Sequence, residues 1–274
     1  MADFDARGYW EQRLTKTYAI DGVGYEGLGP ALNRWMYRVR RHVFLRTLRP
    51  LVTPRMRVLD VGSGTGFYID RWHELGVSSV TGADLTETAV EQLRRRYPAD
   101  RFVRFDVTEE GAPLEPGSFE LVSAMDVLFH VVDDEGFARA FETLFSLLAP
   151  GGHLVFSDNF VHGPAQRARH QVSRPIEEIQ AVVGAAGFEV VERRPMFVLL
   201  NAPVDSRSRL LGTTWHVLSS ASARRNVLGA ILGAVAYPLE LGLLSRVREG
   251  PSTELMVCRR PEVPAAGMDA TQSP

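Results

Sequence analysis

The chain has 274 residues, of which 45% are hydrophobic and 23% are charged. These proportions are typical of soluble globular proteins and exclude a collagen-like repeat, a coiled coil or a wholly disordered chain. The formal net charge of −2 gives no general attraction to nucleic acid, and the length suffices for one α/β domain with appended segments.

The charges are unevenly distributed along the chain. Residues 31–57 carry eight arginines and no carboxylate, whereas residues 100–142 are predominantly acidic. Cys258 is the single cysteine, which excludes an intrachain disulfide and a cluster of cysteine ligands for zinc. The amino terminus is acidic and aromatic and does not resemble a secretory signal, so we expect a cytoplasmic protein without a metal site.

Strand and helix patterns alternate from residue 57 onward. Short apolar runs predict strands over residues 57–61, 77–84, 102–105, 119–125, 153–157, 188–191 and 253–259. Helices are expected after the first strand, over 87–97 with Thr86 as the N-cap, over 137–148 ending at Pro150-Gly151-Gly152, and over 175–186 after the cap Ser173. This alternation predicts a doubly wound α/β fold with a mostly parallel seven-stranded sheet.

Residues 1–54 lie outside this pattern, and we expect helices within them. Residues 31–49 predict an amphipathic helix with Arg34, Arg38 and Arg41 opposite an apolar stripe. Three interpretations stay open for the arginines: a solvated face, a grip on an anionic group of a ligand, or attachment to an acidic membrane surface.

Residues 201–250 form a second segment outside the pattern, in which we also expect helices. Residues 226–244 are nearly long and apolar enough to span a membrane, but Pro238, Glu240 and the return to the last strand argue against a span. A helical cover over an apolar pocket and plain core packing are the two interpretations. The tail, residues 261–274, is predicted to be disordered.

A glycine-rich loop follows the first strand. Gly62, Ser63, Gly64 and Gly66 come directly after Asp60-Val61 and before a helix, where a chain without Cβ atoms lets a ligand approach the backbone. Asp84 ends the second strand, where a carboxylate can accept hydrogen bonds from both hydroxyls of a ribose. The loop by itself is also compatible with a tight structural turn.

Four sequence blocks together resemble the class I S-adenosylmethionine-dependent methyltransferases of the small-molecule type. The blocks are Val-Leu-Asp-Val-Gly-Ser-Gly-Thr-Gly at 58–66, Gly-Ala-Asp at 82–84, Phe-Asp-Val at 105–107 and Leu-Ala-Pro-Gly-Gly at 148–152. The resemblance covers about residues 55–194 and the last strand. The nicotinamide-binding alternative is disfavoured because Phe67 occupies the position where that fingerprint needs a small residue, and Asp60 would repel a pyrophosphate.

The resemblance implies S-adenosylmethionine as the cofactor and assigns its binding residues. Gly62, Ser63 and Gly64 would pass beneath the amino-acid part of the cofactor, with Asp60 near its ammonium group. Asp84 and Leu85 would bind the ribose, and Asp106 and Val107 would bind the adenine. Met125 would contact the methionine part of the cofactor, and Tyr25 would form a lid.

A base near the transferred methyl group assists methylation of a hydroxyl. His130, just beyond the fourth strand, is the leading candidate, with Asp126 beside it on the floor of the site. The competing interpretation is that His130 merely caps or packs the following helix. The second candidates are Asp158, His162 and His170.

The expected reaction is methylation of a small, hydrophobic metabolite, with oxygen as the first choice of acceptor atom and carbon or nitrogen next. The alternative is a cofactor-binding protein of the same fold with a cyclase-like or regulatory role. We expect no nucleic-acid partner, and peripheral membrane contact is not favoured. Residues 1–51, including Tyr9 and Trp10, and residues 201–250 are expected to form the roof of the acceptor site together.

Overall fold

The computed structural model of the chain describes residues 4–25, 27–109 and 111–262, so nearly all of the predicted tail lies outside the described residues. These residues form a seven-stranded sheet in which β9 alone runs antiparallel to its neighbours, β5 and β8. This arrangement confirms the predicted doubly wound fold. In sheet order the strands are β3 (Arg101–Arg104), β2 (Val80–Asp84), β1 (Val58–Val61), β4 (Phe119–Ala124), β5 (Leu148–Asp158), β9 (Glu254–Arg259) and β8 (Glu189–Pro195).

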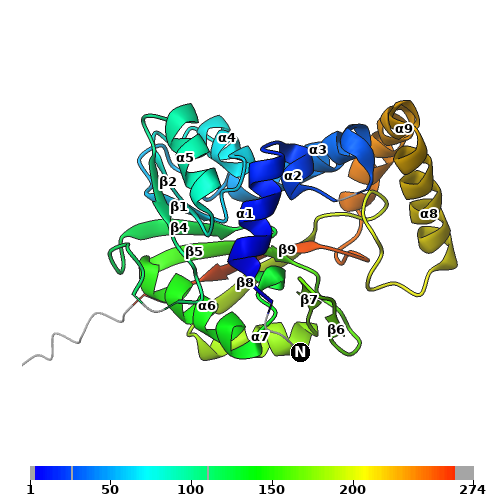
Figure 1. Ribbon diagram of the computed structural model, residues 1–274. Helices are drawn as coiled ribbons and strands as arrows, with labels where there is room; N and C mark the ends of the chain where they lie inside the picture. The colour runs from blue at the N-terminus through cyan, green and yellow to red at the C-terminus, as the bar shows by residue number, and fades with distance from the viewer. Residues whose placement is uncertain (1–3, 26, 110, 263–274) are drawn as a thin grey trace, which may run out of the picture.

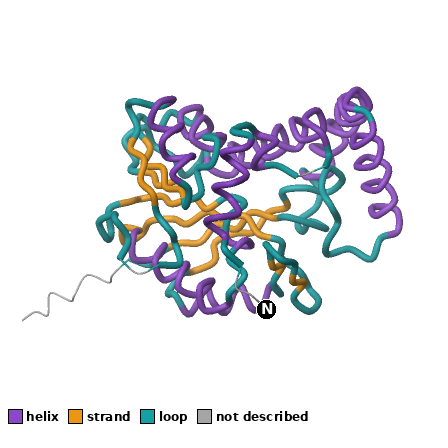
Figure 2. Tube along the Cα trace, viewed as in Figure 1, coloured by secondary structure: helices purple, strands orange, loops and turns teal. Residues whose placement is uncertain are grey.

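Helices cover both faces of the sheet (Figures 1 and 2). Alternate side chains of a strand point to opposite faces, so Leu121 of β4 joins one core and Val122 joins the other. The first core is completed by α3 (Gly29–Leu48), α4 (Phe67–Glu74) and α5 (Glu87–Arg96), and the second by α6 (Asp134–Leu147) and α7 (Ile176–Ala185).

The strand register brings three loops to one edge of the sheet. Val61 at the end of β1 pairs with Ala83 of β2 on one side and with Ala124 of β4 on the other. The segments that follow these three strands therefore leave the sheet side by side at its carboxyl edge, where open α/β sheets bind ligands.

Several predicted boundaries differ from the structure. The predicted cap Ser173 lies in the short strand β7 (Val172–Ser173), which pairs with β6 (Gln166–Arg167), and Pro175 directly precedes α7. Gly151 does not separate α6 from the fifth strand, because β5 already begins at Leu148 and includes Gly151. A sequence pattern of glycine and proline cannot distinguish an irregular strand start from a loop.

Four further helices are built from the two added segments. They are α1 (Ala6–Lys16) and α2 (Ile20–Val23) near the amino terminus, and α8 (Arg209–Arg224) and α9 (Asn226–Leu244) in the insertion. In Figure 1, α1 crosses in front of the sheet, whereas the hairpin of α8 and α9 projects at the far end of α3. α9 packs chiefly on α3 and α8.

Candidate active site

A cavity of about 760 Å³ opens at the carboxyl edge of the sheet. Its volume is within the range of small-molecule and cofactor sites. One part is lined by the glycine loop and by the segments that follow β2 and β3, and the other by α1, α3 and the turn Leu128–His130 after β4. Both predicted subsites, for a cofactor and for an acceptor, therefore belong to one continuous space.

The glycine loop adopts a backbone conformation that residues with a side chain rarely take. Gly62 and Gly64 have φ angles of +72° and +51°, in the left-handed region that disfavours other residues. A Cβ atom on Gly62 would lie 2.2 Å from Cγ2 of Val127. The Gly62 amide donates to the carbonyl oxygen of Ala83 over 2.8 Å, so the loop folds back onto β2 and exposes its backbone to the cavity.

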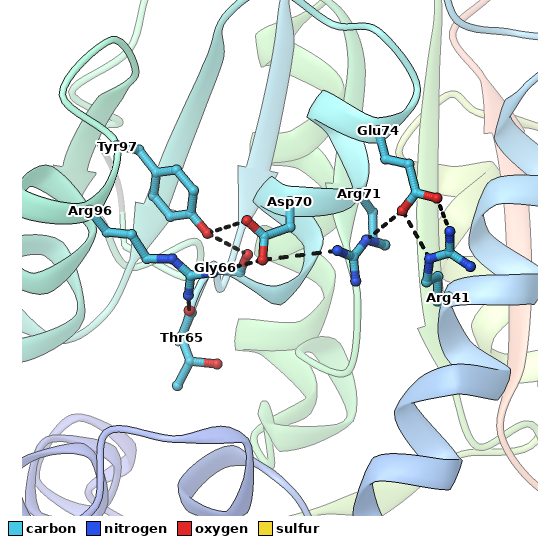
Figure 3. A network of polar contacts seen from close by, with 8 residues as sticks. All are labelled: Arg41, Thr65, Gly66, Asp70, Arg71, Glu74, Arg96 and Tyr97. Carbon is cyan, nitrogen blue, oxygen red and sulfur yellow. Dashed lines mark hydrogen bonds and ion pairs between the residues drawn. The ribbon is translucent and has the colours of Figure 1, made fainter.

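A polar network holds the end of this loop and the start of α4 (Figure 3). Arg96 donates to the carbonyl oxygen of Thr65 over 3.1 Å, and the Tyr97 hydroxyl donates to that of Gly66 over 3.1 Å. Both side chains also bond Asp70 in the first turn of α4, at 2.8 and 2.7 Å. The network ties the loop to α5 and fixes the backbone that faces the cavity.

Asp84, the last residue of β2, and Asp106, shortly after β3, line the cavity with their carboxylates. Asp84 accepts from the Gly64 amide at 2.8 Å and from the amide and hydroxyl of Thr86 at 2.9 and 2.7 Å. Burial raises the pKa of Asp84. Asp106 accepts from the amide and hydroxyl of Thr108 at 3.0 and 2.7 Å. The local bonds fix both carboxyl groups at the cavity wall.

Asp60 differs from these two acids because it does not line the cavity. Its Oδ1 accepts from the Ser123 hydroxyl at 2.5 Å, and its Oδ2 is buried without a hydrogen-bond partner among the described residues. Burial raises the pKa of Asp60 to about 6. The glycine loop bonds Asp60 through its backbone instead, because the Ser63 hydroxyl donates to the Asp60 carbonyl oxygen over 2.8 Å.

Asp126 forms an ion pair inside the cavity. Its Oδ2 lies 2.7 Å from Nε of Arg40, and the Tyr68 hydroxyl donates to the same oxygen over 3.4 Å. The backbone of Asp126 has a φ of +59°, a strained conformation for a residue with a side chain, and its amide donates to Ser157 over 2.7 Å. These bonds aim the carboxylate at Arg40, so Asp126 is a paired anion rather than a free base.

His130 is held in one tautomer. Its Nδ1 lies 2.7 Å from the carbonyl oxygen of His170, and a carbonyl only accepts, so Nδ1 carries the proton and Nε2 carries the lone pair. Burial lowers the pKa of His130 to about 4. The ring is therefore neutral at physiological pH and has an unprotonated nitrogen.

Aromatic side chains of α1 cover this histidine. The Trp10 ring meets that of His130 edge to face with centroids 4.9 Å apart, and Tyr9 stacks on His170 at 5.4 Å. Glu11 anchors the helix by accepting from the backbone amides of Glu87 and Thr88 at 2.9 and 3.1 Å. Tyr9 and Trp10 of α1 thus line the cavity beside the two histidines.

Most of the predicted site residues line this cavity. They are Tyr25, Gly62, Ser63, Gly64, Asp84, Leu85, Asp106, Val107, Met125, Asp126, His130 and His170. Asp158 is buried away from it, and His162 forms an exposed ion pair with Asp205 at 2.6 Å, so neither can act as the base there.

The prediction that residues 201–250 help to cover the cavity is wrong, because none of them is among its lining residues. The insertion packs beside α3 instead, and its Trp215 meets Tyr25 of the cavity wall with ring centroids 5.8 Å apart.

Arg40 is a cavity residue that the sequence pattern did not single out. It lies on the same helix as Arg34, Arg38 and Arg41, all of which are exposed. Arg40 follows Met36 and Tyr37 at helical spacing on the edge of the apolar stripe, and its side chain reaches the cavity across the rings of Tyr37 and Phe197. Its position on the border of the stripe was the available signal.

Comparison with known proteins identifies the central part of the chain. Residues 58–152 match the model of a family described as a methyltransferase domain. The ubiquinone biosynthesis O-methyltransferase of Albidiferax ferrireducens is 38% identical over 106 residues, which are 37% of this chain and 40% of that protein. The chain thus matches less than half the length of this relative.

Two solved structures share the fold at low sequence identity. The cyclase SpnF has a TM-score of 0.54 and 18% identity over 82% of this chain and 81% of its own. The Burkholderia thailandensis 1,6-didemethyltoxoflavin-N1-methyltransferase, solved with its namesake compound and S-adenosylhomocysteine, has a TM-score of 0.52 and 18% identity over 83% and 79%. Residues 58–152 of this chain thus match a methyltransferase domain, and the two solved structures share its fold.

Proposed function

We propose that the chain is an S-adenosylmethionine-dependent methyltransferase that methylates an oxygen of a small, hydrophobic, aromatic acceptor. The observation that carries the proposal is the single cavity that has the glycine loop and two acids at one end and His130 under aromatic rings at the other. The domain's family and the relatives named as O-methyltransferases support the same reaction.

The residues present fit this cofactor. The left-handed Gly62 and Gly64 leave room for a group against the backbone, and Asp84, held at the cavity wall, would accept hydrogen bonds from the ribose hydroxyls. Asp106 and the Val107 amide would hold the adenine, while Met125 would contact the methionine part. The bound cofactor supplies an electrophilic methyl group, so the chain's own residues have to bind, align and exclude water.

His130 is the proposed base. Because its Nδ1–H is engaged by the His170 carbonyl, Nε2 is the atom that would take the proton from an acceptor hydroxyl. The low pKa keeps Nε2 unprotonated above about pH 4, at the cost of weaker basicity. Asp126 would act as a positioning residue that holds Arg40 in the cavity wall, where the guanidinium favours a developing oxyanion.

Tyr9 and Trp10 would exclude water from the reacting groups. Both rings lie on the cavity side of α1 and contact the two histidines, and they also offer flat apolar surfaces to an aromatic acceptor. Because these two rings can pack against another ring, we prefer an aromatic acceptor to an aliphatic one.

Calorimetry tests the cofactor assignment. The wild-type chain should bind S-adenosylmethionine and S-adenosylhomocysteine but not NAD, and Asp84→Ala should weaken binding while Glu91→Ala on the exposed face of α5 should not. Tighter binding of NAD, or equal effects of the two variants, would contradict the assignment.

Transfer of label from methyl-labelled cofactor to a panel of phenols of increasing hydrophobicity tests the reaction. His130→Ala should lower turnover by about 10²–10⁴-fold if His130 is the base, and cofactor affinity should change little. Wild-type turnover in that variant would make His130 a structural residue. Cofactor binding without transfer to any acceptor would support the alternative of a non-methylating cofactor-binding protein.

A further inference from the structure

Helix α9 shows its large apolar side chains to solvent. Val227, Ile231, Val235 and Leu239 repeat every four residues along one face, and each is between 55% and 68% exposed. By length and composition alone α9 could cross a membrane, because an 18-residue stretch of it has a mean hydropathy of 1.9. Only 22% of that stretch is buried in the protein. An ordinary surface helix presents polar residues on such a face.

The opposite face of α9 is fixed to the protein by small residues. A Cβ atom on Gly233 would lie 2.1 Å from the Trp35 ring, and one on Gly229 would lie 2.2 Å from the Ser222 hydroxyl. The Glu240 carboxylate accepts from the amides of Val198 and Leu199, both at 2.7 Å. The helix therefore cannot rotate its large side chains inward, and crossing a bilayer would expose these buried contacts.

The charges around this face are of one sign. Residues 206–239 contain four arginines and no Asp or Glu. Arg207, Arg209, Arg224 and Arg225 are exposed, and none of the ion pairs found among the described residues includes them. On α8, Leu210 and Val217 are also exposed. The hairpin thus combines uncovered apolar side chains with cations that no carboxylate of the described part of the chain neutralises.

We propose that the hairpin of α8 and α9 is a docking surface for an anionic lipid bilayer, on which α9 lies within the interface rather than across it. Apolar side chains that insert at the boundary of the acyl chains and arginines that meet acidic headgroups are the two contributions that such binding requires. A second copy related by a two-fold axis fits less well, because the same arginines of both copies would face one another.

The docking surface adjoins the rim of the cavity. Trp215 of α8 contacts Tyr25, and the Asn226 side chain at the start of α9 accepts from the Ala31 amide at 2.8 Å. A docked chain would hold this rim beside the lipid, which would let a hydrophobic acceptor pass from the bilayer to the cavity. That consequence rests on the proposed function, whereas the docking itself does not.

Co-sedimentation of the full chain with vesicles tests the proposal. Wild type should bind vesicles of phosphatidylcholine mixed with phosphatidylglycerol and not vesicles of phosphatidylcholine alone, and added salt should weaken the binding. The variants Ile231→Glu with Val235→Glu, and Arg224→Glu with Arg225→Glu, should each lose at least about tenfold in the partition constant. The first variant places carboxylates where apolar side chains would insert, and the second reverses two cations that would meet acidic headgroups.

The matched control is Val190→Glu with Val191→Glu, which places the same charges on two exposed valines of β8. It should bind vesicles like wild type, and circular dichroism and cofactor binding should show all variants folded. Absent binding to anionic vesicles, or an equal loss in the control, would overturn the proposal. So would a stable dimer that dissociates only in the α9 variant while vesicle binding is absent. Vesicle binding with no methyl transfer would contradict only the proposed function.

Discussion

Replacing Gly62 with alanine should destabilise the folded protein for two reasons. The first is the left-handed backbone, which costs a residue with a Cβ about 1–2 kcal/mol. The second is close approach: the new Cβ would lie 2.2 Å from Cγ2 of Val127. Val127 is β-branched and lines the cavity, so it cannot move aside without reshaping the wall, and overpacking of this kind costs about 1–3 kcal/mol.

Gly117 provides the matched control. Its φ of +67° is close to the +72° of Gly62, but no heavy atom lies within 4 Å of a Cβ built on it. Gly117→Ala should therefore lower the free energy of unfolding by about 1–2 kcal/mol, and Gly62→Ala by about 2–5 kcal/mol. Urea titration followed by circular dichroism measures both values.

The same pair of variants tests the site. Gly62→Ala should weaken the binding of S-adenosylhomocysteine, measured by calorimetry, by at least about tenfold, which corresponds to 1.4 kcal/mol. Gly117→Ala should leave it unchanged. If the two variants lose equal stability and bind equally well, Val127 does yield and the loop is not a cradle for a ligand.

Three other predictions concern the cavity wall. Arg40→Met should cost about 2–4 kcal/mol of stability in urea titration by stranding Asp126, and Asp126→Asn in the same chain should restore at least half; no restoration would show that the pair is uncoupled. Because burial holds the pKa of folded His130 near 4, whereas histidine in the unfolded chain titrates near 6.5, only the unfolded chain gains its proton between these values. Stability should thus fall as the pH drops through this window, by about 3 kcal/mol more in wild type than in His130→Gln; a difference that stays constant with pH would contradict this. Glu11→Ala should speed proteolytic cleavage within α1, because the amides of Glu87 and Thr88 lose their acceptor, and unchanged cleavage would show that α1 is held by other contacts.

The sequence determined the fold and predicted most of the residues that line the glycine-loop end of the cavity. Asp84 is the last residue of one strand and the glycine loop follows another directly, and the carboxyl ends of neighbouring parallel strands meet at one edge. Local patterns therefore suffice to bring these residues together, because the alternation of strands and helices already fixes a mostly parallel sheet.

Only the tertiary structure decided which of the remaining polar residues reach the cavity. His130 and His162 were both candidates because each follows a strand, but His130 turns under Trp10 whereas His162 pairs with Asp205 at the surface. Likewise Arg40 reaches Asp126 only because α3 crosses beside the end of β4. These contacts join residues far apart in the chain, which no local pattern records.

The insertion shows the same limit. Residues 226–244 are apolar on every side, so their periodicity could not say which face is buried. Steric fit decides which face of α9 is buried. Gly229 and Gly233 allow α9 to approach Ser222 and Trp35 closely, which no larger side chain permits. The face of α9 that carries these glycines therefore packs against its neighbours, and the larger apolar residues Val227 and Ile231 face outward.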